Sequence, residues 1–163
     1  MIKKTIMGKK KEGNLFVILF LLSIIFSNIG IPSIENSNMM PNYFIALITA
    51  CILNKSSSLN IYKLVIIGLI VDLFVGQLLG QYGLIFICIY LVHFIIQKIL
   101  VIKSTQQLFS LGFFLIISSF FVLWTTSVSH GLFISSNLIF IQSILTFITY
   151  LIFNIFIKKF TAN

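Results

Sequence analysis

Few side chains in this chain of 163 residues could take part in chemistry, and Asp72 is the most informative of them. Asp72 lies inside a long apolar stretch, where burying a charge is so costly that an acidic residue is a functional candidate by default. His93 and His130 lack the spacing of a metal site, and Cys51 and Cys88 form no Cys-x-x-Cys pair. The sequence also lacks paired carboxylates, a Ser–His–Asp order and a glycine-rich phosphate loop. We therefore predict no enzymatic activity, no cofactor and no metal site.

Asp72 shares a four-residue spacing with Gly68, Gly76 and Gly80. This spacing places the four residues along one face of a helix, if the helix continues as far as Gly80. Small residues at such intervals allow two membrane helices to approach each other closely. We predict that the stripe is a helix–helix contact face, in which hydrogen bonds of Asp72 fix the register.

The carboxyl group of Asp72 needs polar partners at its own depth in the membrane. His93 lies about 10 Å too deep for a direct pair, counted along the helices. Side chains at a better matched depth are those of Asn28, Asn42, Thr125 and Thr126. We predict a polar cluster around Asp72 near the outer ends of the helices. The alternative is a protonated or water-exposed carboxyl that affects only membrane insertion or orientation.

The composition assigns the chain to a class. Only 9% of the residues are charged and 59% are hydrophobic, whereas an ordinary soluble domain has about 25% charged residues. This excludes a soluble globule, a disordered chain and a collagen-like chain. The net charge of +8 comes from lysines in small groups, without a large basic face for nucleic acid. The remaining class is an integral membrane protein.

Hydrophobic stretches predict how often the chain crosses the bilayer, since one crossing takes about 20 mostly apolar residues. The uncharged stretch 104–157 would be about 81 Å long as one helix, so it must turn back, at the polar cluster Ser127–Asn137. We predict an all-α bundle of about six transmembrane helices in a single domain, residues 1–163, with a basic tail at 1–13. The predicted spans are 15–31, 39–53, 61–79, 82–100, 108–127 and 138–157.

The positions of the lysines predict the orientation. With six spans, all 11 lysines lie on one side of the membrane. They fall in the two terminal segments, and in or beside the connections around 54–60 and 101–107. The three connections on the other side contain no lysine. Lysine is enriched in cytoplasmic segments. We therefore predict that both termini lie in the cytoplasm.

One part of the sequence resembles a known family. The stretch Gly68-Leu-Ile-Val-Asp72-Leu-Phe-Val-Gly76-Gln-Leu-Leu-Gly80-Gln-Tyr-Gly83, with Pro41-Asn42 opening the preceding helix, resembles MreD, a family of bacterial rod shape-determining proteins. That family has a glycine-rich third helix with an aspartate, followed by a Leu-Gly turn into the next span. The chain length and the number of spans are also similar, and the recognisable part covers about Pro41–Ile102.

The resemblance implies a function. It implies a non-enzymatic scaffold in the bacterial cell membrane, which belongs to the cell-wall elongation machinery and regulates cell shape and peptidoglycan synthesis. The implied partners are an MreC-like bitopic protein, an MreB-like actin homologue, a RodA-like glycosyltransferase, a penicillin-binding transpeptidase and membrane lipids. The residues with an expected structural or interaction role are Asp72, Gly68, Gly76, Gly80, Gly83, Pro41 and Asn42.

A second interpretation stays open from the sequence. The substrate-binding membrane component of an energy-coupling vitamin transporter is also a small six-span bundle, and its cavity opens outward, where we predict the polar cluster. Against it, the first span lacks the small-xxx-small alanine pair of those proteins, and the outer connections are short.

Overall fold

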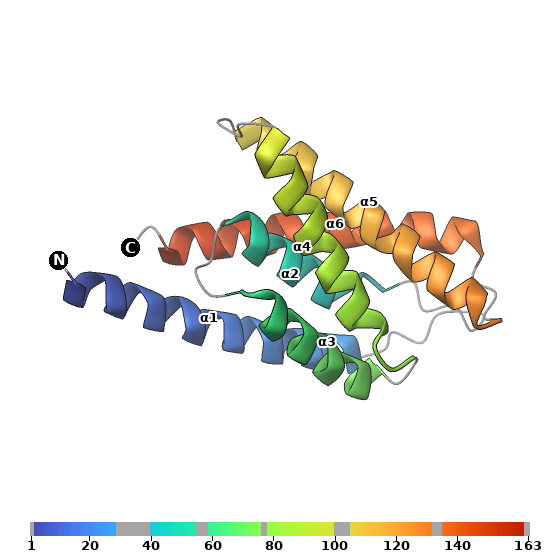
Figure 1. Cartoon of the computed structure of the whole chain (residues 1–163), viewed down its shortest axis with the longest axis horizontal. Helices are drawn as coiled ribbons and strands as arrows, with labels where there is room; N and C mark the ends of the chain where they lie inside the picture. The colour runs from blue at the N-terminus through green and yellow to red at the C-terminus, as the bar shows by residue number, and fades with distance from the viewer. Residues whose placement is uncertain are drawn as a thin grey trace.

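The computed structural model describes residues 2–28, 40–54, 59–75, 78–99, 105–131 and 135–161. All regular secondary structure in these ranges is helical, which confirms the predicted all-α class (Figure 1). The helices are α1 (Ile2–Asn28), α2 (Tyr43–Leu53), α3 (Ile61–Val75), α4 (Gln81–Ile99), α5 (Thr105–Ser129) and α6 (Ser136–Thr161).

Three of these helices are long and apolar enough to cross a membrane. These candidate spans are Gln81–Ile99, Gln106–Ser129 and Asn137–Phe160, in α4, α5 and α6. Two shorter apolar helices cover Gly13–Ser27 and Tyr43–Leu53. The chain is thus an all-helical, multi-pass membrane protein.

Two helices differ in extent from the predicted stretches. α1 begins at Ile2 and therefore includes most of the segment 1–13 that we predicted as a basic tail. Lysine and glutamate are good helix formers, so the charged residues there continue the helix instead of ending it. α3 ends at Val75, earlier than the predicted limit of residue 79.

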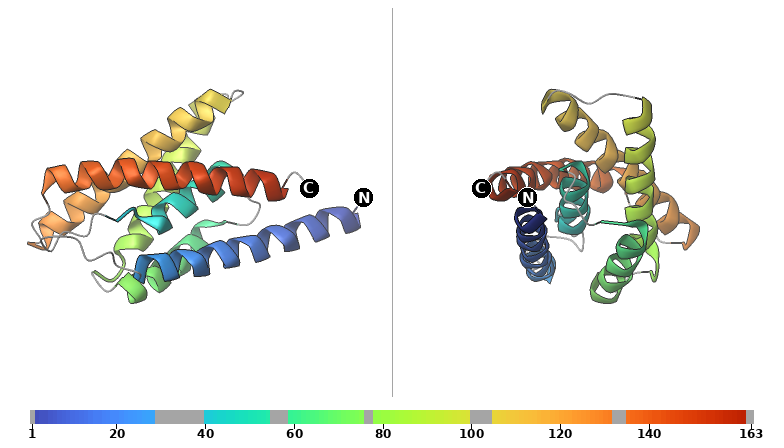
Figure 2. Two further views of the ribbon diagram at one scale, coloured as in Figure 1. Left: turned by 180° about the vertical axis from the view of Figure 1, so that it is seen from behind. Right: turned by 60° about the vertical axis from the view of Figure 1, so that its left-hand side comes forward.

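α2 is a short helix in the centre of the bundle. Its 11 residues give a length of about 16 Å, roughly half the hydrocarbon thickness. It contacts α1, α4, α5 and α6, which surround it in two views (Figures 1 and 2), and every residue from Phe44 to Leu53 is buried. The predicted span at 39–53 is therefore a core helix that does not reach both faces of the membrane by itself.

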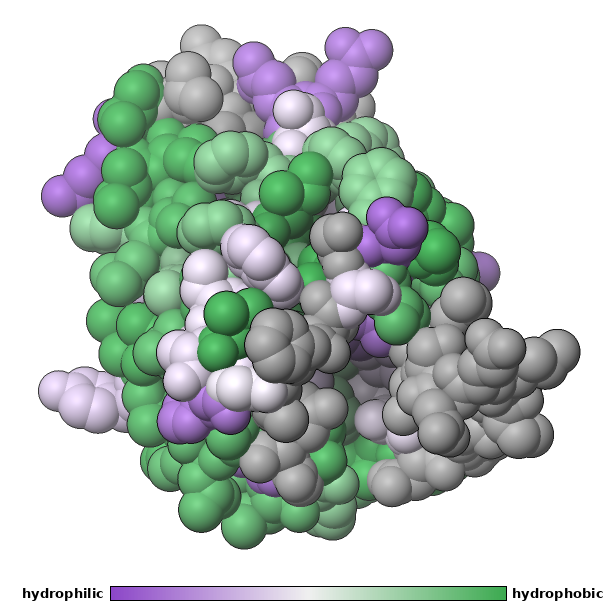
Figure 3. All heavy atoms as spheres, turned by 90° about the vertical axis from the view of Figure 1, so that its right-hand side faces the viewer, coloured by the Kyte–Doolittle hydropathy of each residue, from purple (hydrophilic) through white to green (hydrophobic). Residues whose placement is uncertain are grey.

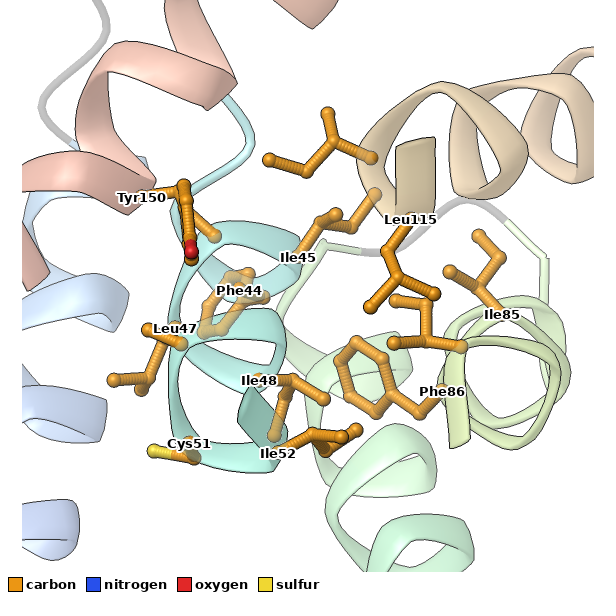
Figure 4. Close-up of a cluster of buried hydrophobic side chains, with 14 of the residues drawn as sticks. Phe44, Ile45, Leu47, Ile48, Cys51, Ile52, Ile85, Phe86, Leu115 and Tyr150 are labelled. Carbon is orange, nitrogen blue, oxygen red and sulfur yellow. The ribbon is translucent and has the colours of Figure 1, made fainter. Parts of the chain in front are cut away.

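The hydrophobic core forms around α2. Phe44, Ile45 and Ile48 of α2 point toward side chains of the neighbouring helices (Figure 4). These neighbours include Ile85 and Phe86 from α4, Leu115 from α5 and Tyr150 from α6. Because α2 contributes more buried residues than any other described helix, the positions of its two ends influence how the other helices pack.

Candidate functional site

Two glycines bring the backbones of α3 and α4 together. A Cβ atom on Gly68 would overlap the Cα and N atoms of Gly83 and would lie 2.9 Å from the carbonyl carbon of Tyr82. Only a residue without a side chain fits such a position. The predicted helix–helix contact at Gly68 is thus present, and the facing element is α4 of the same chain.

Asp72 binds the first turn of α4 from the side of α3. Its Oδ2 accepts a hydrogen bond from the N–H of Gly80 at 2.8 Å, and its Oδ1 accepts one from the N–H of Tyr82 at 3.0 Å. The side chain is 3% exposed. The first N–H groups of a helix have no partner within the helix and carry partial positive charge, so a carboxylate stabilises them. Asp72 therefore acts as the N-terminal cap of the next helix.

The position of Gly80 corrects the predicted stripe. Gly80 lies in the turn before α4, with φ of 90°, and its carbonyl oxygen accepts the hydrogen bond of Leu84 N–H at 2.9 Å. Since α3 has already ended at Val75, Gly80 does not share a helix face with Gly68 and Asp72. The left-handed φ explains the glycine, because other residues are strained there. Gly76, the fourth member, lies outside the described residues.

Tyr82 joins this arrangement to α2. The Nδ2 of Asn42 donates to the hydroxyl oxygen of Tyr82 at 2.7 Å. Asn42 also caps α2, because its Oδ1 accepts from Ile45 N–H at 3.1 Å, and its own N–H donates to Thr146 Oγ1 of α6 at 2.9 Å. Pro41 immediately precedes this cap. Asn42 thus fixes the start of α2 against both α4 and α6.

Gln81 connects the same turn of α4 to α5. Its Nε2 lies 2.8 Å from Thr126 Oγ1 and 3.3 Å from Ser127 Oγ, and it donates toward both hydroxyl oxygens. Sequence reasoning did not select Gln81, although it lies within the MreD-like stretch. Its position at the start of a predicted helix was the feature of the sequence that could have indicated a polar contact.

We call these residues the polar node: Asn42, Asp72, Gln81, Tyr82, Thr126 and Thr146. The hydrogen bonds of these residues link five helices near the first turn of α4, namely α2, α3, α4, α5 and α6. The node lies toward the end of the bundle where α3 leads into α4 and α5 into α6 (Figure 1). Seen from this end, polar residues gather within a largely apolar described surface (Figure 3).

None of the described side chains that we predicted as partners of Asp72 binds it directly, and they differ in where they lie. Asn42 and Thr126 belong to the node but reach Asp72 only through Tyr82 and Gln81, because Asp72 binds backbone N–H groups. Thr125 is exposed, and its hydroxyl donates to Val122 O of its own helix. The side chain of Asn28 lies outside the described part of the chain. His93 is buried near the other end of α4, as its predicted depth requires.

A second polar contact fixes the other end of α2. The Nδ2 of Asn54 donates to Asn154 Oδ1 of α6 at 2.7 Å and to Ala50 O at 2.7 Å. On α6, Thr146, Tyr150 and Asn154 recur at intervals of four residues and are all buried. This spacing was visible in the sequence as a polar stripe of α6, but it was not singled out. In lipid, polar groups at helix ends need such internal partners.

The chemistry available at the polar node is hydrogen bonding between helices. One carboxyl oxygen of Asp72 accepts a hydrogen bond from the turn before α4 and the other accepts one from α4 itself. The side chains of Asn42 and Gln81 donate to other node residues. Within the described ranges, no group of three His, Cys, Asp or Glu residues could hold a metal ion. The node is therefore equipped to position helices.

These features define a multi-pass helical membrane protein whose intramembrane polar groups hold its helices together. The comparison with protein families is more specific, since residues 8–162 match the family described as rod shape-determining protein MreD. The chain belongs to the MreD family. It is thus a rod shape-determining membrane protein, a component of the rod complex and not an enzyme. No curated protein and no solved structure matches the chain.

Proposed function

We propose that this chain is a scaffold of the cell-wall elongation complex, which regulates cell shape and peptidoglycan synthesis by docking partner membrane proteins. The observation that carries the proposal is the MreD match over residues 8–162, nearly the whole chain. The polar node supports it, because its buried polar groups are used to hold helices in place. A rigid bundle of this kind can present fixed helix surfaces to partner spans.

The bundle is proposed to cross the bacterial cell membrane six times, with both termini in the cytoplasm. Lys63 near the start of α3, Lys98 near the end of α4 and the pair Lys158-Lys159 near the end of α6 support this orientation. The start of α3 and the ends of α4 and α6 lie away from the turns that join α3 to α4 and α5 to α6 (Figure 1). Lysines are enriched on the cytoplasmic side.

The proposed partners are an MreC-like bitopic protein, a RodA-like glycosyltransferase, a penicillin-binding transpeptidase and, at the lysine-bearing side, an MreB-like actin homologue or anionic lipids. Gly68 and Gly83 already contact each other, so their close approach serves the fold. Partner spans would therefore dock on outward surfaces, such as the face of α3 that exposes Ile66, Leu69 and Leu73.

The transporter interpretation finds less support. A binding component needs polar groups that are available to a ligand, whereas Asp72, Asn42 and Gln81 are engaged with other parts of the bundle. The hydroxyl of Thr146 likewise accepts from Asn42 and donates to Gln142 O at 2.7 Å. The node thus resembles a structural joint more than an open binding cavity.

Depletion of the protein tests the proposed function. We expect depleted cells to become round and swollen, because cell-wall elongation loses one of its membrane components. Cell width and length are measured by microscopy, and expression of the unchanged chain from a second copy should restore the rods. Depleted cells of normal shape that require an added vitamin would contradict the scaffold and favour the transporter.

A further inference from the structure

Helices α3 and α6 both expose apolar side chains, but they differ in how much of a membrane they can span. α3 has 15 residues, which gives a length of about 22 Å. The 26 residues of α6 give about 39 Å. Because the hydrocarbon layer of a bilayer is about 30 Å thick, α6 is long enough to cross it with some tilt, whereas α3 is too short.

The positions of the lysines make the apolar band on α3 narrower still. Lys63 is exposed in the first turn of α3, so the part of the helix that faces lipid, from Leu64 to Val75, is about 18 Å long. On α6 the uncharged part from Asn137 to Ile157 is about 31 Å long. A lysine side chain can extend toward water, but this covers only part of the shortfall on α3.

The turn after α3 folds back toward the helix. Asp72 lies one turn before the end of α3, and it accepts hydrogen bonds from the N–H groups of Gly80 at 2.8 Å and Tyr82 at 3.0 Å. The start of α4 therefore lies beside the last turn of α3 and not far beyond it. The exposed Leu79 in this turn thus adds little to the width of the apolar band.

α4 covers less of the membrane thickness than its length suggests. It runs obliquely to α1 and α6 in two views (Figures 1 and 2), so its 19 residues, about 28 Å in length, rise less along the direction of those two helices. α3 packs against α4 at Gly68 and Gly83. The two helices thus form one thin side of the bundle, which we call the α3–α4 side.

The outward side chains of α3 suit lipid better than another helix. Membrane helices pack closely through small residues, and the one glycine of α3, Gly68, already faces α4. The outward side chains are all large and apolar, namely Ile66, Leu69, Ile70, Leu73 and Phe74. Where no partner span covers this face, lipid chains cover it, and a bilayer beside a helix that is too short becomes thinner.

We propose that the α3–α4 side is a lipid-binding face that prefers phospholipids with short acyl chains and thins the bilayer beside it, while the α6 side takes lipids of ordinary chain length. The proposal rests on the six crossings of the proposed function, because α3 has to lie in the membrane. Hydrophobic mismatch sorts proteins between membranes of different thickness. This face would therefore favour thinner regions of the cell membrane.

Tryptophan fluorescence at two positions tests this preference in the purified full chain. Trp124 is the only tryptophan, so in a Trp124→Phe background Leu69→Trp reports on lipid beside α3 and Ile148→Trp on lipid beside α6. The positions are matched, because each lies near the middle of its helix and the side chains are 45% and 50% exposed. Vesicles contain phosphatidylcholine with fourteen-, eighteen- or twenty-two-carbon chains, each mixed with brominated eighteen-carbon phosphatidylcholine, whose quenching of the tryptophan gives the relative binding of each chain length.

We expect the fourteen-carbon lipid to bind about 2-fold more strongly than the eighteen-carbon lipid beside Leu69→Trp, because mismatch has a modest cost for each ångström. Beside Ile148→Trp the eighteen-carbon lipid should bind at least as strongly as the fourteen-carbon one. Lys63→Leu lengthens the apolar band on α3, so it should shift the preference at Leu69→Trp toward longer chains. The matched change Lys159→Leu at the exposed end of α6 should leave that preference unchanged.

Three results would overturn the proposal. The first is an equal chain-length preference at the two tryptophan positions, and the second is a preference at Leu69→Trp that Lys63→Leu does not move. The third is quenching at Leu69→Trp that appears only when the protein is diluted in lipid, because a second copy would then cover α3. Rod-shape restoration in depleted cells is measured separately, so a chain that restores rods but shows equal preferences would refute the lipid face and leave the scaffold standing.

Discussion

Replacing Gly68 by alanine should destabilise the bundle and abolish its ability to restore rod shape in depleted cells. The added methyl group would overlap the backbone of Gly83, which cannot rotate away as a side chain can. Overpacking typically costs about 1–3 kcal/mol, and the better helix propensity of alanine recovers at most about 1 kcal/mol. Because α3 must move away from α4, both hydrogen bonds of Asp72 should also lengthen. The melting temperature in detergent and the cell width measure the two effects.

Gly13→Ala is the matched control for this substitution. Gly13 is also a helical glycine, but nothing lies within 4 Å of a Cβ atom built on it. The same chemical change there should leave cell shape intact and stabilise α1 by up to about 1 kcal/mol. A Gly68→Ala protein as stable and as functional as Gly13→Ala would show that α3 and α4 do not touch at this point.

Asp72→Leu should be more damaging than Asp72→Asn. Leucine leaves the N–H groups of Gly80 and Tyr82 without an acceptor, at a cost of about 1–3 kcal/mol for each buried group. Asparagine keeps one acceptor oxygen but turns an amide group toward the other N–H, and it loses the favourable charge at the start of α4. We therefore expect stability and rod-shape restoration to decrease from the unchanged chain to Asp72→Asn and further to Asp72→Leu.

Thr125→Leu controls for the loss of a polar group at the same end of the bundle. Its hydroxyl binds only its own helix among the contacts described, at Val122 O, so the variant should behave as the unchanged chain. Thr125 was a predicted partner of Asp72, whereas the observed partners are the N–H groups of Gly80 and Tyr82. An unchanged Thr125→Leu protein would show that Asp72 does not depend on Thr125. Wild-type stability and shape in both Asp72 variants would reduce that residue to a bystander.

The sequence was sufficient to predict the class of the fold and to single out Asp72 as an acid that needs polar partners. A lone acid in an apolar helix is conspicuous, and Asn42 after Pro41 is a recognisable helix start. The atoms that Asp72 binds were not predictable in the same way. They are backbone N–H groups 8 and 10 residues further along the chain, and they come within reach only when the chain turns back between α3 and α4.

The length of α2 illustrates another limit of the sequence. Hydropathy predicted a span at 39–53, but it did not indicate that this segment is surrounded by protein, because apolar residues look the same in sequence whether protein or lipid surrounds them. The structure shows an 11-residue helix with both ends held by asparagines. The partners Thr146 and Asn154 are about 100 residues away in the chain. Only the four-residue spacing of Thr146, Tyr150 and Asn154 on α6 could have indicated a buried polar stripe.

The glycine stripe was predicted correctly at Gly68 and incorrectly at Gly80. A four-residue period describes a face only while the helix continues, and α3 ends at Val75. Gly80 serves the turn instead, with a φ of 90°. A regular spacing in sequence therefore identified two useful glycines but assigned one of them to the wrong element.

Six crossings with the lysine-bearing side in the cytoplasm are the central claim, because the depth of the polar node and the docking surfaces depend on it. Cysteine labelling in intact cells tests it most directly, in a chain whose Cys51 and Cys88 are replaced by alanine. Ser129 and Asn60 are both exposed. Ser129 ends α5 and Asn60 directly precedes α3, so the proposed topology places them on opposite sides of the membrane. A membrane-impermeant maleimide should label Ser129→Cys in intact cells and Asn60→Cys only after lysis. Labelling of Asn60→Cys in intact cells would contradict the proposed topology.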